Sequence, residues 1–90
     1  MSQAQPESAL QFPCEFPVKA FGIGSDGFER RVADLVRRHV PELADSAVAS
    51  RPSKGGKYLA VTLTIQAESQ AQLDAVYREL TACAEVVMAL

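Results

Sequence analysis

The 90-residue sequence contains no tryptophan, one histidine and two cysteines, and it lacks any long run of apolar residues. Two cysteines are too few for a disulfide framework, which predicts reduced thiols and a cytoplasmic protein. The short apolar runs predict no membrane-spanning helix, and the first residues show no pattern of a secretion signal. Nine basic residues against eleven acidic ones give a net charge of −2, which disfavours a nucleic-acid binder.

Residues suited to catalysis are also scarce. His39 is the single histidine, so a metal site or a proton relay built on two histidines is excluded. It falls on the apolar face of a predicted helix, where a structural role outweighs a catalytic one. Cys14 and Cys83 lack the flanking positive charge that activates a thiol. We therefore predict a non-catalytic protein without a metal or a cofactor.

The apolar residues, 48% of the chain, follow regular patterns. Residues 1–11 are mostly polar and predict a disordered tail, so we expect a single domain over residues 12–90. The strongest pattern is the strict alternation of residues 58–66, which is typical of a strand with one apolar face. Three further strands are predicted, over residues 18–23, 47–51 and 85–90.

Two amphipathic helices separate these strands. Asp26 and Glu29 have the spacing of a helix cap and its third residue, and Pro41 ends the first helix. Ser69 and Gln72 have the same spacing at the start of the second helix. The order of elements predicts an α+β fold, the ferredoxin-like βαββαβ plait. Right-handed crossovers give a four-stranded antiparallel sheet of order 4-1-3-2 with both helices on one face.

The hairpin between the second and third strands is a candidate anion-binding site. Its glycine amides and its cations could hold a phosphate or a carboxylate, although the spacing is not that of a P-loop. A solvated turn whose glycines supply positive φ is the alternative. The candidate residues are Arg51, Ser53, Lys54, Gly55, Gly56 and Lys57.

The face of the third strand that points away from the helices is flat and uncharged. It presents Tyr58 as its one aromatic residue, which is too little for the base stacking of an RNA-binding plait. The surface is suited instead to a second copy of the chain or to a partner protein. The last strand, near Met88, lies at the edge of the sheet and could extend it across two chains. A homodimer through the sheet face or its edge is therefore one hypothesis.

Several motifs along residues 12–90 occur together. They are Phe12-Pro13, Phe16, Lys19, Gly22, Arg51-Pro52-Ser53-Lys54-Gly55, Tyr58, Val61-Thr62-Leu63-Thr64-Ile65, Leu73, Tyr77, Leu80 and Val86-Val87-Met88-Ala89-Leu90. In this combination the chain resembles the YbeD-like family of small bacterial cytosolic proteins. The resemblance implies a plait similar to ACT-type regulatory domains, which bind small ligands such as amino acids and often control an enzyme. It also implies a link to lipoate metabolism, and it supplies no catalytic residues.

ACT-type domains usually bind their ligands near the loop between the first strand and the first helix. That loop covers residues 22–27 here, and its amides at a helix N-terminus could receive a carboxylate. A tight turn that needs glycine is the alternative. The candidate ligand-binding residues are Gly22, Gly24, Ser25, Asp26 and Gly27. The resulting interpretation is a regulatory domain that acts through a small ligand or a protein partner, with anion binding at the hairpin as the alternative.

Overall fold

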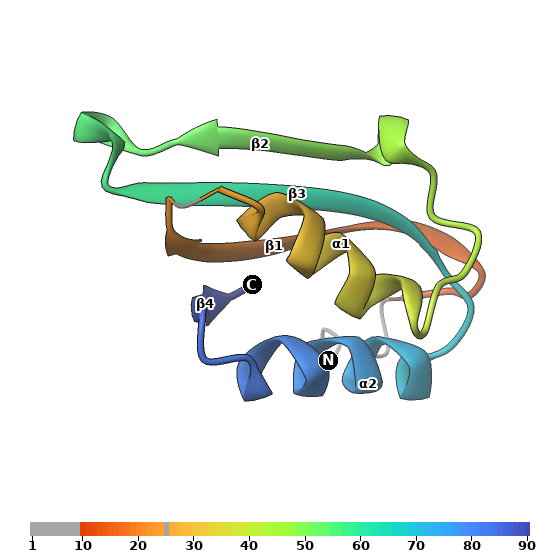
Figure 1. Cartoon of the computed structure of the whole chain (residues 1–90). Coiled ribbons are helices and arrows are strands. Elements are labelled where there is room, and N and C mark those ends of the chain that lie inside the picture. The colour runs from red at the N-terminus through yellow and green to blue at the C-terminus, as the bar shows by residue number, and fades with distance from the viewer. Residues whose placement is uncertain (1–9, 25) are drawn as a thin grey trace, which may run out of the picture.

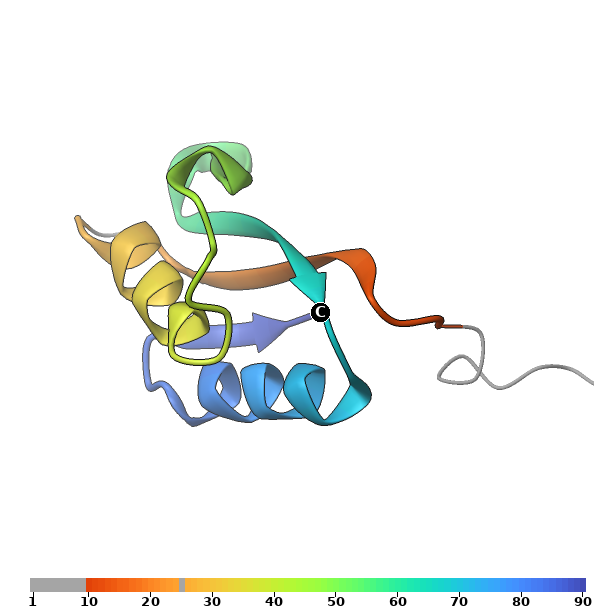
Figure 2. The ribbon, with the colours of Figure 1, turned by 90° about the vertical axis from the view of Figure 1, so that its right-hand side faces the viewer.

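The computed structural model describes residues 10–24 and 26–90. Four antiparallel strands form one sheet in the order β2-β3-β1-β4, and both helices lie on the same face of it (Figures 1 and 2). The strands are β1 (Cys14–Ile23), β2 (Val48–Pro52), β3 (Tyr58–Ala67) and β4 (Val86–Ala89). The helices are α1 (Phe28–Arg37) and α2 (Gln70–Ala82), with short 3₁₀ turns η2 (Asp45–Ala47) and η3 (Lys54–Gly56). The predicted ferredoxin-like plait is confirmed.

The two central strands, β1 and β3, pair along their whole length, from Cys14–Ala67 to Ile23–Tyr58. Strand β1 begins earlier than its predicted start at residue 18, because Pro17 does not interrupt it. The Lys19 amide donates to Leu90 on the β4 side, so the nitrogen of Pro17, two residues earlier, faces the same side beyond the end of β4. A missing N–H is tolerated at such an unpaired position.

The core lies between the sheet and the helices. Alternate residues of β3 point into it, and the helices contribute one apolar face each, as predicted. Phe28, at the start of α1, is among its largest fully buried side chains. Leu10 and Phe12 pack against this core from the segment before β1. The expected tail at residues 1–11 lies mostly outside the described residues, and the domain boundary at residue 12 stays a proposal.

The two helices begin in different ways. The Ser69 hydroxyl accepts the Gln72 amide at 3.1 Å, which confirms the predicted cap of α2. The Gln72 side chain accepts from the Glu68 amide at 2.7 Å. Helix α1 has no side-chain cap, and its N-cap residue is Gly27 with φ of 83°. The prediction that Asp26 caps α1 is therefore wrong, since a glycine in the left-handed conformation makes the turn into the helix.

The difference between the two caps can be measured. Ser69→Ala removes the acceptor of an otherwise unsatisfied amide and is expected to lower the free energy of unfolding by about 1 kcal/mol. Asp26→Ala is expected to change it by less than about 0.5 kcal/mol, because this exposed side chain caps nothing. Urea denaturation followed by circular dichroism measures both values. An equal loss in the two variants would contradict the assignment of the caps.

Candidate functional site

The two glycine-rich loops lie side by side at one end of the sheet (Figure 1). The Gly24 amide, in the loop between β1 and α1, donates to the Lys57 carbonyl in the β2–β3 hairpin at 3.1 Å. The pairing of Ile23 with Tyr58 brings the loops together. The sequence predicts them as separate sites, because the register of β1 against β3 is needed to join them.

The described glycines of residues 22–27 each have a local structural role. Gly22 is buried, and a methyl group on it would overlap the Phe28 ring and the Glu85 carbonyl oxygen. Gly24 donates its amide to the hairpin, and Gly27 turns the chain into α1. These roles agree with the turn interpretation.

The remaining loop residues add little to a ligand site. Ser25 lies outside the described residues. Asp26 is exposed, and its carbonyl oxygen lies 3.5 Å from a guanidinium nitrogen of Arg31. Ligand binding at this loop stays a prediction.

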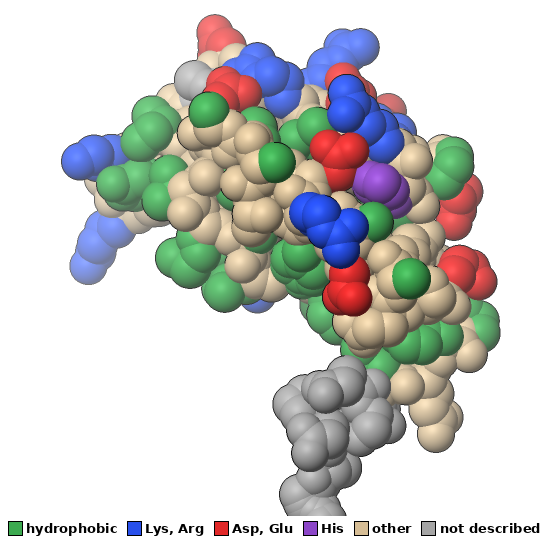
Figure 3. Space-filling model, turned by 90° about the horizontal axis from the view of Figure 1, so that it is seen from below, with side chains coloured by type: hydrophobic (Ala, Val, Ile, Leu, Met, Phe, Trp, Pro, Cys, Tyr) green, Lys and Arg blue, Asp and Glu red, His purple; other side chains and the backbone are tan. Residues whose placement is uncertain are grey.

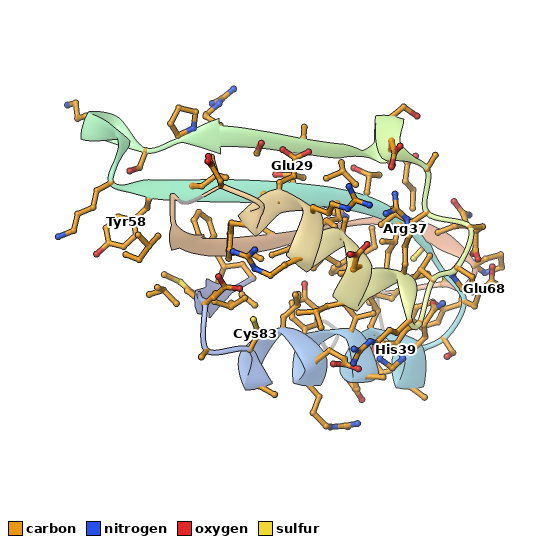
Figure 4. The ribbon with its side chains drawn as sticks, in the orientation of Figure 1. Glu29, Arg37, His39, Tyr58, Glu68 and Cys83 are labelled. Carbon is orange, nitrogen blue, oxygen red and sulfur yellow. The ribbon has the colours of Figure 1, made fainter. Side chains whose placement is uncertain are left out.

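The hairpin is held by its own hydrogen bonds. The Ser53 hydroxyl accepts the Tyr58 amide at 3.0 Å, and the Ser53 carbonyl accepts the Gly56 amide at 2.8 Å. Gly55 and Gly56 have φ of 84° and 75°, which side chains rarely adopt. The Lys57 ammonium lies 5.6 Å from the centroid of the Tyr58 ring, whose position Figure 4 shows. The glycines thus meet the needs of a turn, and anion binding here stays a prediction.

Arg51 is separated from the other hairpin cations by its place in β2. It pairs with Ala60 on β3 and lines a hollow on the sheet face opposite the helices. This hollow has a volume of about 480 Å³. We call it the outer-face hollow, lined by Lys19, Phe21, Ala49, Ser50, Arg51, Ala60 and Thr62.

An apolar patch adjoins the hollow. Ile23, Met88 and Leu90 are 52%, 51% and 59% exposed, although each is a large aliphatic residue. Pairing places Ile23 beside Tyr58 and Phe21 beside Met88, and Leu90 exchanges two backbone hydrogen bonds with Lys19. We call this set the outer-face patch: Phe21, Ile23, Tyr58, Met88 and Leu90. In the sequence its members are spread over three segments. The alternation of side-chain direction along each strand is the one sequence signal that they share a face.

Several charged side chains on the helix side of the molecule form ion pairs. Arg31 and Glu85 form a bidentate ion pair. The hydrogen bonds to Glu85 raise the pKa of Arg31, although desolvation acts to lower it. The Arg37 guanidinium lies 2.6 Å from Asp45. Seen from below, this side shows acidic and basic side chains around the histidine (Figure 3).

His39 and the two cysteines show no catalytic arrangement in the described part of the chain. The His39 ring lies 3.3 Å from the Glu79 carboxylate, which also contacts Arg38 at 3.4 Å. Cys14 and Cys83 are half-buried free thiols. Residues 10–24 and 26–90 contain no cluster of three potential metal ligands.

A second hollow of about 630 Å³ lies between α1 and the edge strand β2. Glu29 and Arg37 extend into it from α1 (Figure 4). Both already have partners, since the Ser50 hydroxyl donates to Glu29 at 2.5 Å and Arg37 donates to the Leu43 carbonyl at 2.9 Å. Burial raises the pKa of Tyr77 on α2, which packs against the core and takes no part in either hollow.

Comparison with known proteins assigns the chain to a family. The model of the family described as "Protein of unknown function (DUF493)" matches residues 7–90. The chain belongs to the DUF493 family. A family member, a UPF0250 protein of Chromobacterium violaceum, is 40% identical over 86 residues, which is 96% of this chain and 97% of the relative. UPF0250 protein NE1487 of Nitrosomonas europaea is 40% identical over 74 residues, covering 82% of this chain and 85% of the relative. The resemblance to the YbeD-like family is confirmed.

The fold of the DUF493 family also appears in a solved structure. The solution structure of protein HP0495 from H. pylori superimposes with a TM-score of 0.69, covering 99% of this chain and 98% of that one. The two sequences are only 11% identical, so the likeness extends to the fold alone. Over the residues that the structure describes, no helix is both long and apolar enough to cross a membrane.

Proposed function

We propose that this DUF493 protein is a non-catalytic, ACT-like regulatory domain that acts by binding a partner protein. The observation that supports the proposal is the outer-face patch, because both helices cover the opposite face and leave its members Ile23, Tyr58, Met88 and Leu90 exposed. Contiguous exposed apolar surface of this kind marks interaction sites in small proteins. Aromatic residues and methionine, here Phe21, Tyr58 and Met88, are enriched where proteins bind one another.

Two features of the site favour a partner protein over a small ligand. The described glycines of the 22–27 loop are accounted for by packing and turn geometry. In the hollow between α1 and β2, the charged groups of Glu29, Arg37 and Asp45 already have partners. A small ligand at residues 22–27, and a role around lipoate metabolism, remain further hypotheses within this regulatory interpretation.

The alternative function is anion binding by the β2–β3 hairpin. The exposed side chain of Lys54 and the open surroundings of Gly55 and Gly56 favour it. It differs from the main proposal because it depends on the hairpin tip and leaves the outer-face patch without a role. Titration with inorganic phosphate, compared between the wild type and Lys54→Ala, tests it separately.

Site-specific photo-cross-linking in bacterial cells tests the main proposal. A photoreactive phenylalanine analogue at position 88, in the outer-face patch, is expected to give one dominant cross-linked protein. The same analogue at the exposed position 71 on α2 serves as the matched control and should not capture that protein. Adding Ile23→Ser should weaken the position-88 product severalfold, since it removes apolar contact area.

The outcomes of the cross-linking are distinct. A product whose mass is twice that of the chain would identify a second copy as the partner. Equal labelling from positions 88 and 71 would contradict a specific interaction at the sheet face.

A further inference from the structure

The positive charges of this chain are divided between two sides of the molecule. Of the five arginines on the helix side, Arg31, Arg37 and Arg38 each lie within 4 Å of a carboxylate, whereas Arg30 and Arg78 have none that close in the described part of the chain. On the outer face, Lys19 and Arg51 have no acidic group within 4 Å in the described part of the chain. The chain is acidic overall, so carboxylates are available, yet these two cations are left without one.

The pairing of the strands also places few acidic residues on the outer face. Glu15 is the one acidic residue of β1 and β3 on that face, and it pairs with Gln66 at the far end of the ladder. Glu15 precedes Lys19 by four positions, which places the two backbones about 13 Å apart along the strand. The hairpin tip adjoining this face adds Lys54 and Lys57. Basic side chains therefore outnumber acidic ones around the outer-face hollow, which favours an acidic ligand there.

The two cations stand at opposite corners of the hollow. Arg51 shares a row with Ala60 and Phe21, and Lys19 shares the next row on that face with Thr62 and Ala49. Their backbones are offset by two strand spacings across the sheet and by two residues along it, which places them roughly 12 Å apart. The small side chains of Ala60 and Thr62 lie between them, with the Phe21 ring as one wall.

We propose that the outer-face hollow binds an acidic segment of the partner protein, in which two carboxylates flank one apolar side chain. This inference rests on the proposed function and names the chemistry of its partner. In an extended segment of the pattern Glu-x-Leu-x-Glu, the three named side chains point the same way and the two glutamates are about 13 Å apart. The carboxylates then reach Lys19 and Arg51, and the leucine lies on Ala60 against Phe21.

The surroundings of the hollow favour a protein over a nucleic acid. A single-stranded nucleic acid needs aromatic rings on which successive bases stack. Here the rings of Phe21 and Tyr58 are accompanied by the aliphatic side chains of Ile23, Met88 and Leu90. Those side chains match apolar contacts of a protein and offer no surface for base stacking.

Chemical-shift mapping on the ¹⁵N-labelled chain tests the inference. The probe is a blocked Glu-Ser-Leu-Ser-Glu peptide, with Gln-Ser-Leu-Ser-Gln and octa-uridine as comparison ligands. The acidic peptide is expected to shift the amide signals of Lys19, Phe21, Ala49 and Arg51. The glutamine peptide should bind about tenfold more weakly, since each of two exposed ion pairs is worth up to roughly fivefold. Equal binding of the two peptides, or tighter binding of octa-uridine, would overturn the inference.

Charge-reversal variants supply the matched control. Lys19→Glu with Arg51→Glu is expected to abolish detectable peptide binding, whereas Lys54→Glu, which changes charge outside the hollow, should reduce it less than about threefold. The same variants carry the photoreactive residue at position 88. Loss of that cross-link in the double charge-reversal variant, but not in Lys54→Glu, supports an acidic partner. A cross-link that survives the double reversal would reject the acidic partner and leave the proposed function standing, whereas failure of the wild-type cross-link at position 88 would reject both.

Discussion

Replacement of Phe28 by alanine is expected to lower the free energy of unfolding by about 3–5 kcal/mol. The side chain is 1% exposed and opens α1, where its ring packs against Gly22 of β1. Removing the ring leaves a cavity between sheet and helix that the neighbouring backbone cannot fill. A domain of this length has a total stability of roughly 5–13 kcal/mol, so the variant should be close to unfolding.

Phe21→Ala provides the matched control for that change. It removes the same ring from a half-buried position on the outer face, where solvent can occupy the space. We expect the free energy of unfolding to fall by about 1 kcal/mol. Because the chain has no tryptophan, urea denaturation of both variants is followed by circular dichroism. Comparable losses at the two positions would show that the core does not depend on Phe28 as the structure indicates.

Gly22→Ala is expected to lower the free energy of unfolding by about 3 kcal/mol, although it adds a single methyl group. That methyl would overlap both the Phe28 ring and the Glu85 backbone carbonyl, and neither is the flexible end of a side chain. Gly24→Ala is the control two residues away. Its methyl would meet its nearest atom, the Gly56 carbonyl oxygen, at 3.5 Å, so we expect a change within about 0.5 kcal/mol.

The two core variants can be combined. The methyl group added at position 22 and the Phe28 ring compete for one space. The free energy of unfolding lost by the double variant Gly22→Ala with Phe28→Ala should therefore be at least about 1 kcal/mol smaller than the sum of the losses of the two single variants. Additive losses would assign the strain at position 22 to the Glu85 carbonyl alone. Equal stability of Gly22→Ala and Gly24→Ala would instead contradict the close approach of α1 to β1.

Much of the fold could be predicted from local patterns. The alternation from Tyr58 onward defines β3, and the Ser69 hydroxyl caps α2 as its spacing to Gln72 predicts. The start of β1 could not be predicted, because whether Pro17 interrupts a strand depends on where β4 ends. The spacing to Glu29 predicts Asp26 as the cap of α1, whereas the N-cap is Gly27, in a left-handed conformation that sequence spacing does not reveal.

The candidate site was less accessible to sequence reasoning. Glycines and cations marked the loops, but the structure explains most of those glycines by turns and packing. The outer-face patch depends on strand register, since a slip of one residue in β1 would turn Phe21 and Ile23 to the other side of the sheet. No local pattern could show that Phe21 lies beside Met88, or that Lys19 and Arg51 border one hollow.

The uneven division of charge gives this molecule an electric dipole that its net charge of −2 conceals. An acidic partner that approaches the helix side meets Arg31, Arg37 and Arg38 already paired with carboxylates, whereas one that approaches the sheet meets Lys19 and Arg51, which have no acidic group within 4 Å in the described part of the chain. The field acts over about one Debye length, close to 8 Å at physiological salt. It therefore turns the two proteins toward the correct faces before contact, and the association rate rather than the lifetime of the complex carries the dependence on salt.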